Sequence, residues 1–286
     1  MKQGFSQKEL PPRQRKLFCE ISPLCYEISV AKCCVMRHLR DLFSKDHFCR
    51  LRSEKQLPVV IYKHKSLIRR QLGEVDMTLQ ENKAINLALA APKISGVLIR
   101  PGDVFSLWHL VGRTSARKGY REGLMIRHGK PDKGIGGGLC QLSNLIHWIV
   151  LHTPFEIVEH HHHDGIDLFP DFGRQVPFGV GTSISCNYLD YRFKNNTEQS
   201  FQLIVFTDDK YLNAELRSEQ PLDVKYHIQS RNEHFVKENG IYFRCGEVWR
   251  ECVDKSTGRV LGSQLIKSNH ARVMYDEKYI GNKNRQ

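Results

Sequence analysis

The most constraining feature of this chain is a glycine-rich stretch that leads into one cysteine and then an apolar helical pattern. Residues 134–165 read GIGGGLCQLSNLIHWIVLHTPFEIVEHHHHDG. Glycines at this density free the backbone to approach a neighbouring group closely. Leucine, isoleucine and valine then recur close to a 3.6-residue period, which predicts a buried helix over 141–152. The sequence therefore predicts a rigid helix that carries Cys140 at its N-terminal end.

Cys140 has three interpretations. At the start of a helix, backbone N–H groups and the helix dipole stabilise a thiolate, lower the pKa of the thiol and make it nucleophilic. The same N–H groups, helped by the amide of Gln141, could hold an oxyanion. In the second interpretation, Cys140 is a small apolar core residue. The third is a phosphate-binding loop, but no Lys-Ser or Lys-Thr pair follows the glycines as a P-loop requires.

The four consecutive histidines 160–163 are candidates for a base that would activate Cys140. Neutral imidazole suits general-base work near pH 7, and a nearby carboxylate such as Asp167 could orient it. Metal binding is the competing interpretation, because His147 and His152 add further donors. Their spacing matches no standard zinc site, so we expect no metal and no other cofactor.

The remaining pattern predicts an α+β fold. Residues 1–56 are mostly helical and basic, and 78–91 form a capped helix. Strand patterns dominate after residue 95, with an expected hairpin turn at Asn195–Thr197. Helices followed by many antiparallel strands indicate a helical N-terminal segment and then a mixed, largely antiparallel sheet with a buried Gly-Cys helix. We expect three parts, at 1–56, 57–276 and a flexible tail at 277–286.

Charge restricts the partners. The net charge is +12, and residues 1–70 hold sixteen Lys and Arg against six Asp and Glu, which places +10 there. Such a segment suits an anionic membrane surface or an acidic ligand. No nucleic-acid recognition pattern accompanies the charge, so nucleic acid is not an expected partner. Nine irregularly spaced cysteines, no secretory leader and no apolar run of ~20 residues predict reduced thiols and a cytoplasmic protein, peripheral at the membrane.

Five stretches resemble the VanW family and together span most of 57–276. They read RRQLGEVDMTLQENKAINLALAAPKISGVLIRPGDVFSLWHLVGRTSARKGYREG, GGGLCQLSNLIHW, HTPFEIVEHHHHDGIDLFPDFGRQVPFG, CNYLDYRFKNNT and LIKSNHARVMYD. The resemblance implies an accessory protein of glycopeptide (vancomycin) resistance or cell-envelope metabolism, without an established biochemical activity. By position, the characteristic stretch of the family falls on Gly136, Gly137, Gly138, Cys140, Gln141 and Ser143.

The resemblance also ranks the candidate site residues. Relatives carry fewer histidines in the run, which makes His163 the first choice of base and His161 the second, with Asp167 as the orienting carboxylate. Arg174 could hold a carboxylate with its guanidinium fork. Two functions stay open. In one, Cys140 attacks an acyl carbon of a peptidoglycan-type precursor, as a hydrolase or acyltransferase. In the alternative, the chain is a non-catalytic module that binds an anionic cell-wall precursor or an envelope protein, and Cys140 is structural.

Overall fold

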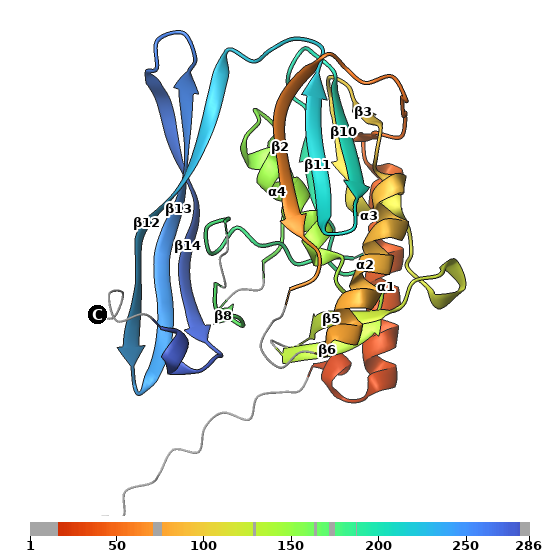
Figure 1. The fold of residues 1–286 in the computed structure, drawn as a ribbon. Coiled ribbons are helices and arrows are strands. Elements are labelled where there is room, and N and C mark those ends of the chain that lie inside the picture. The colour runs from red at the N-terminus through yellow and green to blue at the C-terminus, as the bar shows by residue number, and fades with distance from the viewer. Residues whose placement is uncertain are drawn as a thin grey trace, which may run out of the picture. The chain divides into compact units, whose positions relative to one another are not determined.

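The computed structural model describes residues 17–70, 76–127, 130–162, 165–171, 175–186 and 188–280. The chain divides into two compact units, residues 1–45 and residues 46–286. The smaller unit is helical, and the larger unit carries the sheets together with the glycine-cysteine segment (Figure 1). The α+β class with an N-terminal helix, as predicted from the sequence, is confirmed.

The smaller unit consists of η1 (Phe18–Glu20) and α1 (Pro23–Phe43). Ser22 caps α1, because its side chain accepts a hydrogen bond from the Cys25 N–H, and Pro23 occupies the first helical position. Large apolar residues recur along α1, yet the helix buries none of its residues.

The described residues of the larger unit form three four-stranded sheets and one two-stranded ribbon. Most strand pairs are antiparallel, whereas β1 and β4 are parallel, as are β8 and β14. The elements are β1 (His47–Phe48), β2 (Val59–Leu67), α2 (Met77–Ala90), η2 (Ala91–Lys93), β3 (Val97–Ile99), β4 (Asp103–Ser106), α3 (Leu107–Val111), η3 (Ala116–Lys118), β5 (Glu122–Arg127), β6 (Lys130–Ile135), α4 (Cys140–Leu151), β7 (Glu156–Glu159), β8 (Ile166–Asp167), β9 (Arg192–Lys194), β10 (Phe201–Thr207), β11 (Tyr211–Ser218), β12 (Val224–Glu238), β13 (Ile241–Asp254), β14 (Val260–Val273) and η4 (Glu277–Tyr279).

The sheets have the orders β1-β4-β9-β7, β2-β11-β10-β3, β12-β13-β14-β8 and β5-β6. The predicted hairpin turn at Asn195–Thr197 is wrong, because it connects β9 of one sheet to β10 of another. Asn195 is fully buried there, and its amide donates to the carbonyls of Ile99 and Gln199. These hydrogen bonds to two other segments hold the chain in a crossover, which the local Asn-Asn-Thr pattern does not reveal.

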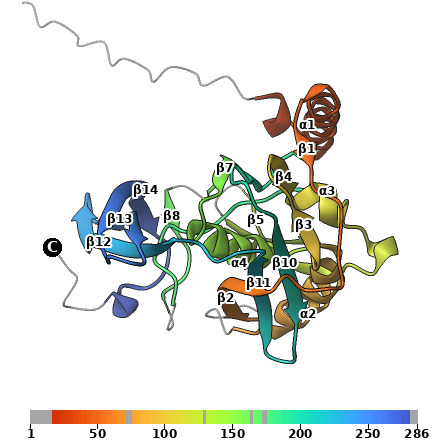
Figure 2. The same cartoon turned by 90° about the horizontal axis from the view of Figure 1, so that it is seen from above.

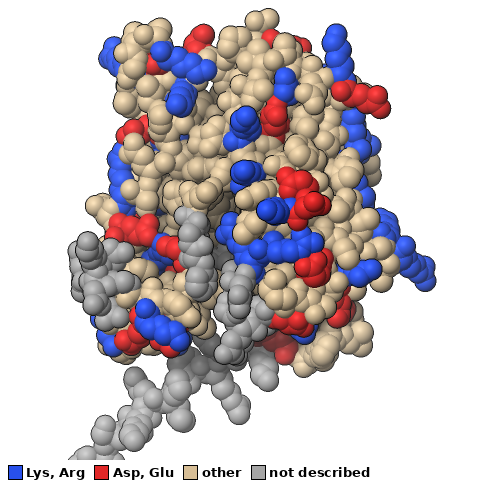
Figure 3. All heavy atoms as spheres, viewed as in Figure 1, with Lys and Arg blue, Asp and Glu red and all other residues tan. Residues whose placement is uncertain are grey.

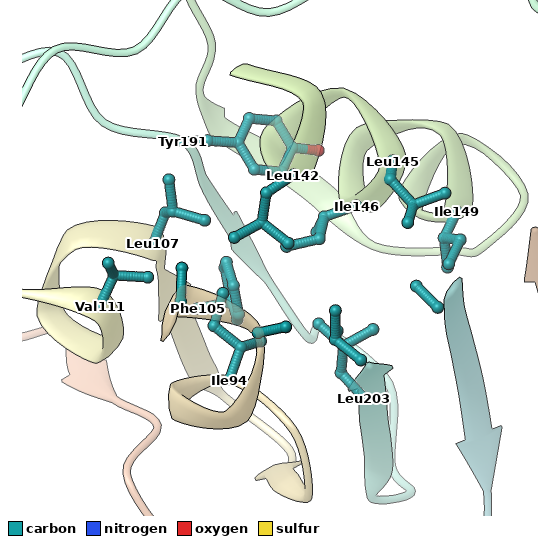
Figure 4. Packing of buried hydrophobic residues seen from close by; sticks show 14 of the residues in the cluster. Ile94, Phe105, Leu107, Val111, Leu142, Leu145, Ile146, Ile149, Tyr191 and Leu203 are labelled. Atoms are coloured by element: carbon teal, nitrogen blue, oxygen red, sulfur yellow. The ribbon is translucent and has the colours of Figure 1, made fainter. Parts of the chain in front are cut away.

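Helix α4 lies at the centre of the larger unit, between the sheet of β12–β14 and the sheet that contains β2, β11 and β10 (Figures 1 and 2). One face packs Leu142 and Ile146 into the main core, against residues such as Phe105 (Figure 4). The other face places Trp148 against Val248 of β13. Each fully buried aliphatic side chain stabilises the fold by about 1.5–3 kcal/mol, so α4 is held firmly from both sides. The predicted buried Gly-Cys helix is thus confirmed.

Within the described residues, no helix combines the length and apolar character required to span a bilayer.

Candidate functional site

The glycines before α4 are required by packing within the protein. A Cβ on Gly137 would lie 2.2 Å from the carbonyl oxygen of Gly123 in β5, and one on Gly138 would lie 2.3 Å from Cγ of Lys83 in α2. Gly136 and Gly138 also have φ angles of 79° and 90°, which favour glycine. The close approach predicted for this loop is therefore to the protein's own backbone and to α2.

Side chains of α2 contact the glycine loop that precedes α4. The Asn86 amide donates to the Gly137 carbonyl at 2.9 Å, and its oxygen accepts from the Arg121 N–H at 2.8 Å. Lys83 is buried and donates to Gln80 Oε1 at 2.7 Å. Burial, followed by repulsion from two nearby arginines, lowers the pKa of Lys83 to about 8. Sequence reasoning missed Lys83, although a lysine on the buried face of an amphipathic helix is a signal that could have identified it.

Cys140 begins α4 as predicted, but its environment differs from the one expected for a thiolate. Burial raises the pKa of the Cys140 thiol, and the backbone amide of Ile184 opposes this only in part. The helix N-terminus alone would have lowered the pKa. The expectation considered one end of an isolated helix, whereas in the fold the thiol is removed from water on the side of Ile184.

The neighbours of Cys140 in the characteristic stretch are engaged in structural contacts. Gln141 donates from Nε2 to Ser66 Oγ and to the Leu67 carbonyl, both at 2.9 Å, and so ties α4 to β2. Ser143 is buried; its hydroxyl donates to the Cys140 carbonyl at 3.0 Å and is hydrogen bonded to Thr182. Both side chains thus make contacts that hold α4 in the fold.

The predicted histidine and aspartate partners lie in different places. His161 Nε2 pairs with Glu159 Oε1 at 2.9 Å. Asp167, on β8, is buried and accepts from Tyr275 at 2.9 Å and from Arg244 at 3.3 Å, in an ion-pair network of the C-terminal sheet. His163 and Arg174 lie outside the described residues. Among the described candidates, the structure therefore pairs His161 and Asp167 with partners other than Cys140.

A different group of histidines is brought together. The ring of His147 lies 4.1 Å from that of His160, which lies 4.0 Å from that of His162. His147 is fully buried, and its Nδ1 is hydrogen bonded to the Tyr191 hydroxyl at 3.0 Å. Burial, and then repulsion among the imidazoles, lowers the pKa of His147 well below its usual range and that of His160 to about 3.

This group is not arranged as a metal centre. The rings are tilted against one another, at 35° and 57°, and no set of three or more His, Cys, Asp or Glu side chains in the described part of the chain is placed to hold a metal ion. The spacing of His147 and His152 suggested only donors on different sides of a helix. The contact between His147 and Tyr191 joins segments 44 residues apart, and no sequence signal anticipates it.

Comparison with known proteins places this architecture in a family. Residues 82–217, from α2 to β11, match the family described as VanW like protein. The chain is 32% identical over 222 residues to the Vancomycin B-type resistance protein VanW of Enterococcus faecalis (strain ATCC 700802 / V583), covering 78% of this chain and 80% of that protein. It is 29% identical over 122 residues to the uncharacterized protein YoaR of Bacillus subtilis (strain 168), covering 42% and 37%. No solved structure matches the chain. The glycine loop, Cys140 and α4 all fall inside the matched residues, and the chain belongs to the VanW family.

Proposed function

We propose that this protein is a non-catalytic binding module of glycopeptide resistance, which holds an anionic cell-wall precursor. The family relative named as a vancomycin resistance protein supports the setting. The net charge of +12 supports an anionic ligand, because the field of a basic protein concentrates anions at its surface. In this proposal Cys140 is part of the architecture.

The environment of the Cys140 thiol carries the proposal. A cysteine nucleophile reacts as the thiolate, so its pKa has to be depressed. Burial raises the pKa of the Cys140 thiol, which disfavours the thiolate at neutral pH. The glycines beside it pack against Gly123 and Lys83, which gives their close approach a role in packing.

Thiol reactivity tests this proposal directly. Iodoacetamide labelling at pH 7, read by peptide mass spectrometry, should be fast at the exposed Cys33 and slow at Cys140, as at the buried Cys49, whose pKa burial raises to about 12. Calorimetric binding of a uridine-diphosphate-linked muramyl pentapeptide should be unchanged in Cys140→Ala. Fast labelling of Cys140 that slows in His163→Ala, together with turnover that Cys140→Ala abolishes, would instead establish the hydrolase or acyltransferase.

We also propose that α1 attaches the protein to an anionic lipid surface. Apolar side chains form a stripe along the helix, with exposed fractions of 70% at Leu24, 45% at Leu39 and 75% at Leu42. Their unit, residues 1–45, holds nine Lys and Arg against four Asp and Glu. A helix with an exposed apolar stripe in a basic segment has the chemistry of an interfacial anchor, to which each basic residue near the surface adds about 1 kcal/mol.

Vesicle co-sedimentation tests the attachment. The protein should sediment with phosphatidylglycerol-containing vesicles, bind more weakly to pure phosphatidylcholine, and lose most binding in Leu39→Asp/Leu42→Asp. The matched control is Phe206→Asp, which removes an apolar side chain that is 50% exposed on β10 of the larger unit. Binding that is equal in both variants, or absent from both kinds of vesicle, would contradict the proposal.

A further inference from the structure

Arg250, on β13, is a half-buried cation without a carboxylate partner among the described residues. Its guanidinium donates to the Thr153 carbonyl and lies 4.0 Å from the centre of the Tyr226 ring. Arg244 on the same strand is different, because it pairs with three carboxylates, those of Asp167, Asp171 and Glu233. An arginine that is partly removed from water without a counter-ion is costly unless an anion is supplied from elsewhere.

The groups around Arg250 add further basic character. His152, at the end of α4, is repelled electrostatically by Arg250, by His64 of β2 and by His227 of β12. Burial is the larger cause, and together they lower the pKa of His152 to about 4. His64 and His227 thus act on His152, and Arg250 is tied to the end of α4 beside His152 through the Thr153 carbonyl. The side chains that offset the burial of Arg250 are Tyr226, Cys252 and Tyr191, and none of these is a carboxylate.

Aromatic rings surround this basic group. Tyr62 of β2 is stacked on His152 with ring centres 3.8 Å apart, and Trp148 meets His152 edge-on at 4.7 Å. The Nε of Arg250 is buried and has no hydrogen-bond acceptor within the part of the chain that the structure describes. A buried donor without an acceptor costs about 1–3 kcal/mol. A ligand oxygen that accepted from the Arg250 Nε would remove this cost.

The exposed cations of β2 lie on the other side of the sheet from this group. Lys63 and Lys65 are exposed and alternate with the half-buried Tyr62 and His64 along the edge strand. Lys, Arg, Asp and Glu side chains are interspersed on the face that carries β2 (Figure 3). Attraction of an anion would therefore come from Arg250 and its neighbours.

We propose that Arg250, His152 and His64, enclosed by Tyr62, Trp148 and Tyr226, form a binding site for a small oxyanion, the phosphate or carboxylate of a larger ligand. The guanidinium offers a planar pair of donors that matches either group. The imidazoles can donate further hydrogen bonds once protonated, and the rings can pack against the atoms that carry the anion. This site deepens the proposed function, on which its physiological ligand rests, because it states where the anionic part of a cell-wall precursor would be held.

Sulfate binding tests the site by itself, because sulfate keeps its charge between pH 5.5 and 7.5. Calorimetry at constant ionic strength should show at least a tenfold weaker affinity in Arg250→Lys, Arg250→Met and His152→Gln. Arg231→Gln is the matched control, because Arg231 lies on β12 of the same sheet but is paired with Glu251. Arg250→Lys retains the charge and guards against loss of folding. Binding should also tighten as the pH falls from 7.5 to 5.5, because an anion favours protonated His152 and His64.

Larger probes distinguish the source of the oxyanion. If uridine diphosphate displaces sulfate, the oxyanion of the ligand is a phosphate. If a dipeptide displaces sulfate when its carboxyl terminus is free but not when that terminus is amidated, the oxyanion is a carboxylate. No sulfate binding, or equal binding in Arg250→Lys, His152→Gln and Arg231→Gln, would overturn the site. If the muramyl precursor binds equally well to wild type and Arg250→Lys, the site is wrong and the proposed function stands. If sulfate binds but the precursor does not, the proposed function fails and the site stands.

Discussion

Lowering the pH from 7.5 to 5.5 should destabilise the larger unit by about 4 kcal/mol, because three histidines are held neutral in the fold. These are His147, His152 and His160. Burial is the largest cause in each case, and it lowers the pKa of His152 to about 4, that of His160 to about 3 and that of His147 well below its usual range.

The sign and magnitude follow from proton linkage. In the unfolded chain each imidazole titrates near its ordinary pKa of 6.5, so below that pH the unfolded state binds protons that the native state does not. Stability is therefore fully present above pH 6.5 and falls as the pH is lowered towards the folded pKa values. One pH unit below 6.5, each histidine costs about 1.4 kcal/mol, and three cost about 4 kcal/mol. That is a large part of the ~5–15 kcal/mol that stabilises a typical domain.

Urea unfolding at a series of pH values measures this effect. The window ends at pH 5.5 so that solvated carboxylates stay ionised and contribute little. His160→Gln should reduce the pH-dependent loss by about a third. His270→Gln, which removes an imidazole that is 54% exposed and paired with Glu238, should not reduce it. A stability that is flat across this window, or a His160→Gln variant with the wild-type pH dependence, would refute the reasoning.

Two further predictions concern packing and charge. Gly137→Ala should destabilise the fold by about 3 kcal/mol or more in thermal or urea unfolding, because its Cβ would overlap the backbone of Gly123. Gly181→Ala is the control: its Cβ would meet nothing within 4 Å, so stability should change by less than about 1 kcal/mol. Equal effects of the two substitutions would contradict the packing role of Gly137. Asp167→Asn should cost about 2 kcal/mol in urea unfolding by weakening the contact with Arg244, while precursor binding stays at the wild-type level. If Asp167→Asn instead weakens precursor binding without a loss of stability, Asp167 is part of the binding site.

Much of the fold could be predicted from the sequence because its signals are local. The capped helix expected at 78–91 is α2 (Met77–Ala90), and the apolar period after Cys140 is the one that α4 buries. The family was also evident, because its characteristic stretches are contiguous in the chain. The crossover at Asn195–Thr197 was missed, since its hydrogen bonds reach Ile99 on a strand that is distant in sequence.

The chemistry of the candidate site depended on contacts that no local pattern encodes. The helix-dipole argument for Cys140 was sound for an isolated helix, but the direction of the pKa shift is set by burial, which outweighs the dipole. In the same way, Arg250 is one arginine in a β-hairpin pattern. Its proposed role rests on its contact with the Thr153 carbonyl beside His152 and on the absence of a carboxylate partner among the described residues.

The sequence by itself determined the family, the α+β class and the position of the glycine-cysteine helix, because glycine requirements and apolar periodicity act over a few neighbouring residues. Only the tertiary structure decided that the glycines serve packing, that burial raises the pKa of the Cys140 thiol and that Arg250 contacts the chain beside His152. Burial and charge pairing depend on segments that are far apart in the chain, and these meet only when α4 is enclosed between β2 and the C-terminal sheet.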